Sequence, residues 1–118
     1  MGEARRGRRF SSLATIDRIV YPSYDSLISL GAAAAVTDRI GLMTNILIAP
    51  VHDGVLLAKE AASVDRLSGG RLTLGLAAGG RRDDFEAVGQ DFATRGARFE
   101  HQLRVMNKVW RGEQLSDW

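Results

Sequence analysis

The segment from Leu42 to Gly80 constrains the fold more than any other part of the chain. It reads LMTNILIAPVHDGVLLAKEAASVDRLSGGRLTLGLAAGG. A short apolar run comes before a turn, an Ala-rich helical stretch, a Gly-Gly stop and a second apolar run, which is the pattern of a strand–helix–strand unit. The connection is long enough to make the two strands parallel, and parallel strands need cover on both faces. The sequence therefore predicts a layered α/β protein.

The rest of the chain continues the alternation of strands and helices. Ser23 is predicted to cap the first helix and Asp53 the second, because short polar side chains accept hydrogen bonds from free N–H groups at helix starts. Three apolar stripes at helical spacing are predicted to be buried: Leu27, Leu30 and Ala34; Leu57, Ala61 and Val64; Phe99, Leu103, Met106 and Trp110. The predicted strands are 10–16, 40–48 and 71–78, and the predicted helices are 24–36, 54–67, a short one from 83 to 89, and 97–110.

Length and composition exclude several classes of protein. With 118 residues there is room for one small domain, so we expect residues 1–118 to form a single unit. The chain has no cysteine and two histidines, so we expect no metal site. Its apolar runs are too short to span a membrane, and no apolar region of a secretory signal follows the start. We therefore expect no membrane contact and a cytoplasmic location.

The net charge of +2 comes from the start of the chain. The first nine residues, MGEARRGRR, hold four Arg and one Glu, whereas the other 109 residues are slightly acidic. The cluster could contact a nucleic acid, but more often such a cluster is a solvated terminus. Since no aromatic platform or nucleic-acid motif accompanies it, we expect no nucleic-acid partner.

Ligands of parallel α/β proteins bind beyond the carboxyl ends of the strands, and this rule selects three places: Asp17-Arg18, residues 45–50 and residues 78–84. Asp17-Arg18 is either a recognition pair for a substrate or cofactor, or a local surface pair. Thr44-Asn45-Ile46 interrupts an apolar strand with two polar residues, which marks either a distortion that serves a ligand or a core polar group with internal partners. Ala78-Gly79-Gly80 either lets a ligand approach the backbone closely or is a simple turn. His52 is predicted to be a loop histidine and His101 an exposed one.

Several segments resemble the bacterial luciferase-like flavin-dependent oxidoreductases. They are DRIVYPSYDSL, AAAAVTDRIGLMTNILIAP, LLAKEAASVDRLSGGRLTLGLAAGG, DDFEAVG and RGARFEHQLRVMNKVW. The resemblance implies a (β/α)₈ TIM barrel in which the three predicted strands are the second to the fourth. It also implies redox chemistry on a small organic substrate. The cofactor would be reduced flavin (FMN), which supports monooxygenation, or a deazaflavin coenzyme, which exchanges hydride.

The resemblance also implies roles for particular residues. The strand with Thr44, Asn45 and Ile46 is similar to one that ends in a cis peptide bond behind the flavin ring, so we assign that bond to Asn45–Ile46. Ala78, Gly79 and Gly80 match a cofactor-contact segment, although Ala78 stands where some relatives have a phosphate-binding Arg. Asp17 and Arg18 match an acid followed by a catalytic His, and Arg18 replaces that His.

Length separates this chain from an intact barrel of the family. Such a barrel needs about 250 residues, so the sequence predicts a partial barrel with about three strands, and a fragment impaired as an enzyme. Residues 1–9 would then be a remnant or a mispredicted terminus. The strand 71–78 presents leucines to one side and small residues to the other, so both faces need cover. The alternative is a catalytically silent half-barrel that self-associates as a homo-oligomer or pairs with a complementary chain.

Overall fold

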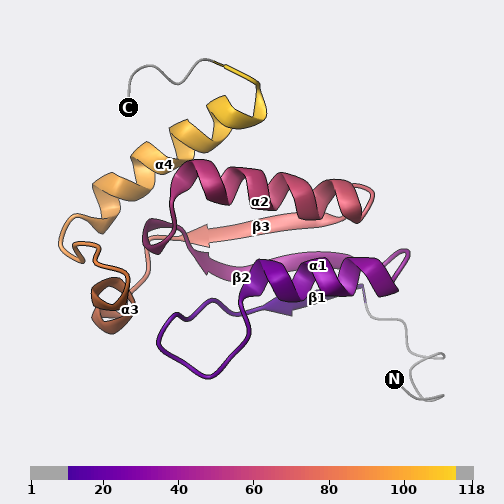
Figure 1. Cartoon of the computed structure of the whole chain (residues 1–118), viewed down its shortest axis with the longest axis horizontal. Helices are drawn as coiled ribbons and strands as arrows, with labels where there is room; N and C mark the ends of the chain where they lie inside the picture. The colour runs from indigo at the N-terminus through magenta and orange to yellow at the C-terminus, as the bar shows by residue number, and fades with distance from the viewer. Residues whose placement is uncertain (1–10, 114–118) are drawn as a thin grey trace.

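The computed structural model describes residues 11–113, so the Arg-rich start lies outside the described residues. Strands and helices alternate along the chain (Figure 1). The strands are β1 (Ser12–Thr15), β2 (Gly41–Ile48) and β3 (Leu72–Ala77). The helices are α1 (Ser26–Val36), the 3₁₀ turn η2 (Ala49–Val51), α2 (Gly54–Leu67), α3 (Arg82–Ala87) and α4 (Arg95–Trp110). Every predicted element is present; the 3₁₀ turn that follows β2 was not predicted.

The three strands form one parallel sheet in the order β1-β2-β3. Their carboxyl ends therefore share one edge of the sheet, on the left in Figure 1. The loops that follow the strands begin at this edge. The predicted α/β class and the parallel direction of the strands are confirmed.

Aspartates cap the two helices that cover the sheet. The carboxylate of Asp53 accepts a hydrogen bond from the Leu56 N–H at the start of α2, as predicted. At the start of α1, however, Asp25 is the cap and accepts from the Ile28 N–H. The prediction of Ser23 as the cap was wrong because α1 begins two residues later than expected, at Ser26.

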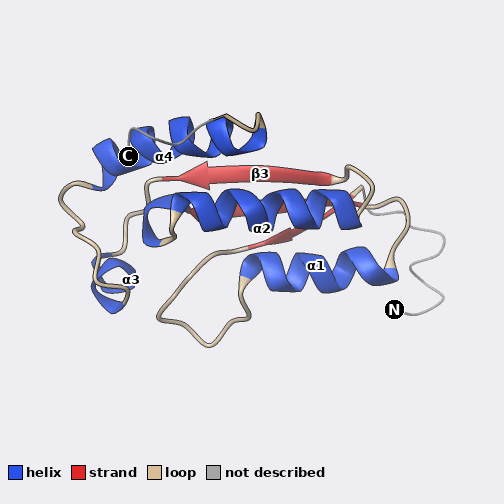
Figure 2. Ribbon diagram, turned by 45° about the horizontal axis from the view of Figure 1, so that its top comes forward, coloured by secondary structure: helices blue, strands red, loops and turns tan. Residues whose placement is uncertain are grey.

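Helices α1 and α2 lie on one face of the sheet, and their packing forms the main core (Figure 2). The predicted stripes of these two helices are buried: Leu27, Leu30 and Ala34 of α1, and Leu57, Ala61 and Val64 of α2. Leu72, Leu74 and Leu76 of β3 pack against this core. The opposite face of the sheet has no helix over it within residues 11–113, and Ala14, Asn45 and Thr73 are exposed there.

Helix α4 packs on α2 instead of on the sheet (Figure 1). Its buried residues are Gln102, Val105 and Met106. The predicted stripe was therefore only partly right, because Leu103 and Trp110 are 36% and 44% exposed. The indole N–H of Trp110 donates to the Ala58 carbonyl at 2.9 Å, which joins the end of α4 to α2.

The segment AKEAASVDRLSGGRLTLGL, which is the part of the sequence most characteristic of the family resemblance, contains a set of hydrogen bonds at the amino end of β3, called here the Arg71 clasp. The Arg71 guanidinium donates to the carbonyls of Ser68, Ile40, Ala34 and Thr37 and to the Thr37 hydroxyl. Asp65 accepts from the Leu72 N–H at 3.1 Å. These bonds join α1, α2 and the starts of β2 and β3, so the segment stabilises the end of the sheet opposite the strand carboxyl ends.

Candidate functional site

A bulge in β2 shapes the carboxyl edge of the sheet. From Thr44 to Leu47 β2 advances three positions, while its partner β3 advances two, from Leu74 to Leu76. The extra residue interrupts the hydrogen-bond ladder. The Thr44 hydroxyl fills the gap, since it donates to the Gly75 carbonyl at 2.8 Å and accepts from the Gly75 N–H at 3.0 Å. Thr44 is fully buried, so this predicted site residue supports the bulge from the helix side.

The bulge carries the two residues that follow Thr44. The peptide bond between Asn45 and Ile46 is cis, as the family resemblance implied. Both residues are exposed, and Ile46 shows 40% of its surface. Gly75 faces them across the strand pair, where an added Cβ would lie 2.4 Å from the Thr44 carbonyl oxygen. The absence of a side chain at Gly75 thus allows the bulge to approach β3.

The second predicted contact segment, Ala78 to Gly80, leaves the end of β3. Gly79 has φ of +88°, and a Cβ there would lie 2.5 Å from a methyl group of Ile48. Glycine adopts this conformation without steric cost. The Arg95 guanidinium donates to the Gly79 carbonyl at 2.9 Å and lies over the Phe92 ring at 3.8 Å from its centre. Helix α4 therefore holds the turn in place.

Asp17 lies just past the end of β1 and is 4% exposed. One of its carboxylate oxygens, Oδ2, accepts from the Ile48 N–H at 2.8 Å and lies 2.8 Å from His52 Nε2. Its own N–H donates to the Ile46 carbonyl at 3.1 Å. These contacts connect the ends of β1 and β2, next to the bulge.

Arg18 points to a different partner. Its Nε donates to Asp84 Oδ2 at 2.7 Å, and its Nη2 lies 3.4 Å from Asp83 Oδ2. Asp84 is fully buried, and its other oxygen accepts from the N–H groups of Ile19 and Val20 at 2.9 and 2.8 Å. The interpretation of Asp17 and Arg18 as a local charged pair was therefore wrong, because each side chain binds a residue much later in the chain.

The contacts of Asp84 determine its ionisation. Burial by itself would raise the pKa of this carboxyl, but the hydrogen bonds from the Val20 N–H, the Arg18 guanidinium and the Ile19 N–H outweigh it, so the pKa lies below its ordinary value of 3.8. The hydrogen bond to Asp84 in turn raises the pKa of Arg18. Both groups are charged at neutral pH, and the loop after β1 is tied to α3.

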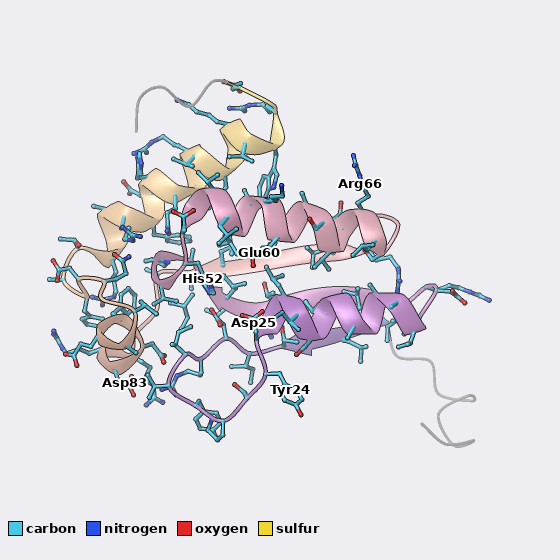
Figure 3. All side chains as sticks on the ribbon, in the orientation of Figure 1. Tyr24, Asp25, His52, Glu60, Arg66 and Asp83 are labelled. Atoms are coloured by element: carbon cyan, nitrogen blue, oxygen red, sulfur yellow. The ribbon has the colours of Figure 1, made fainter. Side chains whose placement is uncertain are left out.

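Two contacts of this edge were not predicted from the sequence. His52 was correctly placed in a loop, but its contact with Asp17 was missed. Asp84 ends the third selected region, but its contact with Arg18 was missed. Residues 35 and 66 positions apart form these pairs, and no local pattern reveals such a pairing. Figure 3 shows His52 and Asp83 at the carboxyl end of the strands and Arg66 at the other end.

The face of the sheet beside the bulge suits a flat ring system. On β3 it presents Thr73, Gly75 and Ala77, whose side chains are small or absent, and Ile46 adds an exposed apolar surface. A planar aromatic cofactor could lie against this surface without displacing a large side chain. The residues present therefore fit a flavin or deazaflavin ring.

Alternative locations for a functional site among residues 11–113 would be a metal cluster, a membrane-spanning helix or a groove. Among residues 11–113 no group of His, Asp and Glu is arranged to hold a metal ion, and none of the helices there is long and apolar enough to cross a membrane. A groove of about 1030 Å³ lies between α2, α4 and the start of β3. None of the predicted site residues lines that groove.

Comparison with known proteins identifies the class. Residues 9–118 match the model of the luciferase-like monooxygenases, so the chain belongs to this family. It is 37% identical over 90 residues to the uncharacterized protein Rv0953c of Mycobacterium tuberculosis, covering 76% of this chain and 32% of that protein. It is 32% identical over 79 residues to the oxygenase component of a flavin-dependent trigonelline monooxygenase from Acinetobacter baylyi, covering 65% and 22%.

Solved structures give the fold. The oxygenating constituent of 3,6-diketocamphane monooxygenase from Pseudomonas putida superposes with a TM-score of 0.80 at 19% identity, covering 92% of this chain and 33% of that one. The coenzyme F420-dependent tetrahydromethanopterin reductase of Methanopyrus kandleri gives 0.61 at 26% identity, covering 76% and 25%. These neighbours are TIM barrels, so the three strands form part of such a barrel. The chain spans about a third or less of the proteins it matches.

Proposed function

We propose that this chain forms the cofactor-contacting part of a luciferase-like oxidoreductase that acts on a small organic substrate. The cofactor is either reduced FMN or a deazaflavin coenzyme of the F420 kind. The observation that carries the proposal is the juxtaposition, at the carboxyl edge, of the Asn45–Ile46 bulge, the Gly79 turn and a sheet face with small side chains.

Each of these residues has a separate part in binding. Asn45 and Ile46 would support one side of the ring, and Thr44 holds the bulge in position from the helix side of the sheet. Ala78, Gly79 and Gly80 would contact the cofactor through the backbone. When bound, the cofactor supplies either oxygen activation or hydride transfer. The protein contributes position and orientation, and it excludes water from the reacting atoms.

Asp17 and Arg18, the residues that we propose for catalysis, lie just past the end of β1 at this edge. The Arg18 side chain is 20% exposed, with Asp84 holding its Nε. The rest of the guanidinium would meet a polar group of the substrate, while Asp84 keeps it from swinging away. Asp17 is buried and would act through its neighbour His52.

Both cofactor choices have support among similar proteins. The Acinetobacter relative is flavin-dependent, and the Methanopyrus reductase depends on coenzyme F420. The Pseudomonas structure contains FMN, but at 19% identity it supports the fold alone. We therefore keep both cofactors and assign the choice to experiment.

The test is a fluorescence titration of the full chain with FMN and, separately, with coenzyme F420. Saturable binding of one of them with a stoichiometry of one per chain is the expected result. Binding of neither cofactor up to millimolar concentration would contradict the proposal. Riboflavin, which lacks the phosphate, serves as the control that measures how much of the affinity comes from the ring itself.

The open face of the sheet favours a second candidate, a silent half-barrel that self-associates or pairs with a complementary chain. Ile16, just after the edge strand β1, is 71% exposed, and Ile46, on the face that the described helices leave uncovered, is 40% exposed. Burying such surface is favourable by about 25 cal/mol per Å². Sedimentation tests this candidate: a monomer at all concentrations would exclude self-association, and a dimer without cofactor binding would favour it over the enzyme.

A further inference from the structure

The pair formed by His52 and Asp17 is the observation from which this inference starts. The Asp17 carboxylate is 4% exposed, so its partners are protein groups and not bulk water. Its Oδ2 lies 2.8 Å from His52 Nε2 and accepts from the Ile48 N–H at 2.8 Å. The carboxylate is therefore fixed by the backbone of β2 and presents a definite position to the imidazole.

This contact selects the tautomer of the imidazole. A carboxylate only accepts hydrogen bonds, so the hydrogen of a neutral His52 ring resides on Nε2, and Nδ1 keeps its lone pair. Within residues 11–113, Nδ1 has no hydrogen-bond partner and is not among the buried polar atoms that lack one. The His52 side chain is 19% exposed. The ring thus has one nitrogen held by the protein and one acceptor nitrogen open.

The backbone around His52 is held on several sides. The His52 N–H donates to the Ala49 carbonyl at 3.0 Å, and the Gln102 amide donates to the His52 carbonyl at 2.6 Å. The Arg98 guanidinium donates to the Pro50 carbonyl at 3.0 Å. Contacts from η2 and α4 therefore keep the imidazole at the carboxyl edge, close to the end of β2. Preorganisation of this kind is typical of groups that bind ligands.

We infer that His52 is a ligand-contacting residue whose Nδ1 accepts a hydrogen bond from a hydroxyl or ring N–H group of the cofactor. Asp17 is its positioning residue, because it fixes which nitrogen is free. The inference rests on the proposed function for the identity of the ligand, whereas the tautomer and the open nitrogen concern the chain alone. It also assigns a role to Asp17 that requires no direct contact with the substrate.

Two measurements on the full chain test the pair without any cofactor. Long-range ¹H–¹⁵N spectra of the imidazoles contain signals from two histidines only, and His101→Gln assigns them. His52 is expected in the Nε2–H tautomer. Asp17→Ala is expected to shift His52 toward the mixture of tautomers shown by exposed His101. If Asp17→Ala does not fold, Asp17→Asn, which conserves the size of the side chain, replaces it. Diethyl pyrocarbonate is expected to modify both histidines at comparable rates. An unreactive His52, or a ring with hydrogen on Nδ1, would overturn the inference.

The third measurement adds FMN as the probe. Saturating FMN is expected to slow carbethoxylation of His52 at least five-fold and to leave His101 unchanged. His52→Gln is expected to weaken FMN binding roughly five-fold, as for one lost hydrogen bond of about 1 kcal/mol, whereas His101→Gln has no effect. If FMN binds by fluorescence but protects neither histidine, the inference fails. If FMN does not bind at all, the proposed flavin function fails, and the pair is judged by the two cofactor-free measurements.

Discussion

Asp84 provides the sharpest test of how the loop after β1 is held. Replacement of Asp84 by Asn keeps the shape of the side chain and removes its charge. An amide oxygen can still accept from the Ile19 and Val20 N–H groups, but the amide nitrogen then faces Arg18 Nε, which donated to the carboxylate at 2.7 Å. The variant loses a charge-assisted hydrogen bond at a fully buried position.

The size of the effect follows from this geometry. Hydrogen bonds to charged groups contribute about 1.5–3 kcal/mol, and breaking a fully buried ion pair costs about 3–5 kcal/mol. Since the Arg18 side chain is 20% exposed, it regains part of its hydration, and we expect a loss of about 2–3 kcal/mol in the free energy of unfolding. In urea this corresponds to a midpoint lower by roughly 1–2 M.

The neighbouring residue supplies the control. Asp83 lies 3.4 Å from the same guanidinium, but its side chain is 57% exposed. Exposed ion pairs contribute little, so Asp83→Asn is expected to change stability by less than about 0.5 kcal/mol. Equal losses for the two variants would refute the reasoning, because they would show that burial of the carboxylate does not matter.

The acid dependence gives a second readout of Asp84. Its pKa in the folded chain lies below the ordinary 3.8, so its contribution to stability is present above pH 4 and is lost as the pH falls through the lowered pKa. The Asp84→Asn variant is expected to lack this component of acid destabilisation. If the free energy of unfolding fell with pH equally steeply in the wild-type chain and in the variant below pH 4, the lowered pKa of Asp84 would be contradicted.

Three further substitutions test other contacts, each by urea unfolding with a matched control. Thr44→Val removes both hydrogen bonds to Gly75 and is expected to cost about 2 kcal/mol, whereas Thr73→Val, on the open face, stays within about 0.5 kcal/mol; equal effects would contradict the role of Thr44 in the bulge. Gly79→Ala forces a Cβ to 2.5 Å from Ile48 at a positive φ and is expected to cost more than about 1 kcal/mol, while Gly80→Ala, with open space around it, is nearly neutral. Arg71→Lys loses the planar set of donors to the carbonyls of three segments and is expected to cost about 2 kcal/mol without changing cofactor affinity. Exposed Arg66→Lys is its control. A loss of cofactor affinity in Arg71→Lys would contradict this expectation, because it would show that the clasp and the site are coupled.

The fold was predictable to the extent that it follows from local patterns. Apolar periodicity located the stripes of α1 and α2 because both helices bury one face against the sheet. The stripe of α4 was misjudged because α4 packs on α2 and buries Gln102, Val105 and Met106, whereas Leu103 and Trp110 stay partly exposed although the indole N–H of Trp110 contacts α2. Periodicity shows that a helix has an apolar face, but the neighbouring element decides which residues it buries.

The site was predictable only in its outline. The rule on carboxyl ends of parallel strands selected three places that the structure brings to one edge of the sheet, and the family resemblance selected the Asn45–Ile46 bond, which is cis. The partners of Asp17 and Arg18 were not predictable, since His52 and Asp84 come from other loops of the same edge. Such contacts depend on how the loops fold over the strand ends, which a single sequence does not encode locally.

The central claim is that the carboxyl edge of this sheet binds the cofactor. It is tested most directly by mapping amide chemical-shift changes of the ¹⁵N-labelled full chain during titration with FMN or coenzyme F420. The account predicts that the largest changes fall on Asn45, Ile46, Gly79 and Gly80, with little change at the Arg71 clasp. Changes that concentrate instead in the groove between α2 and α4, around Ala58 and Trp110, would contradict it.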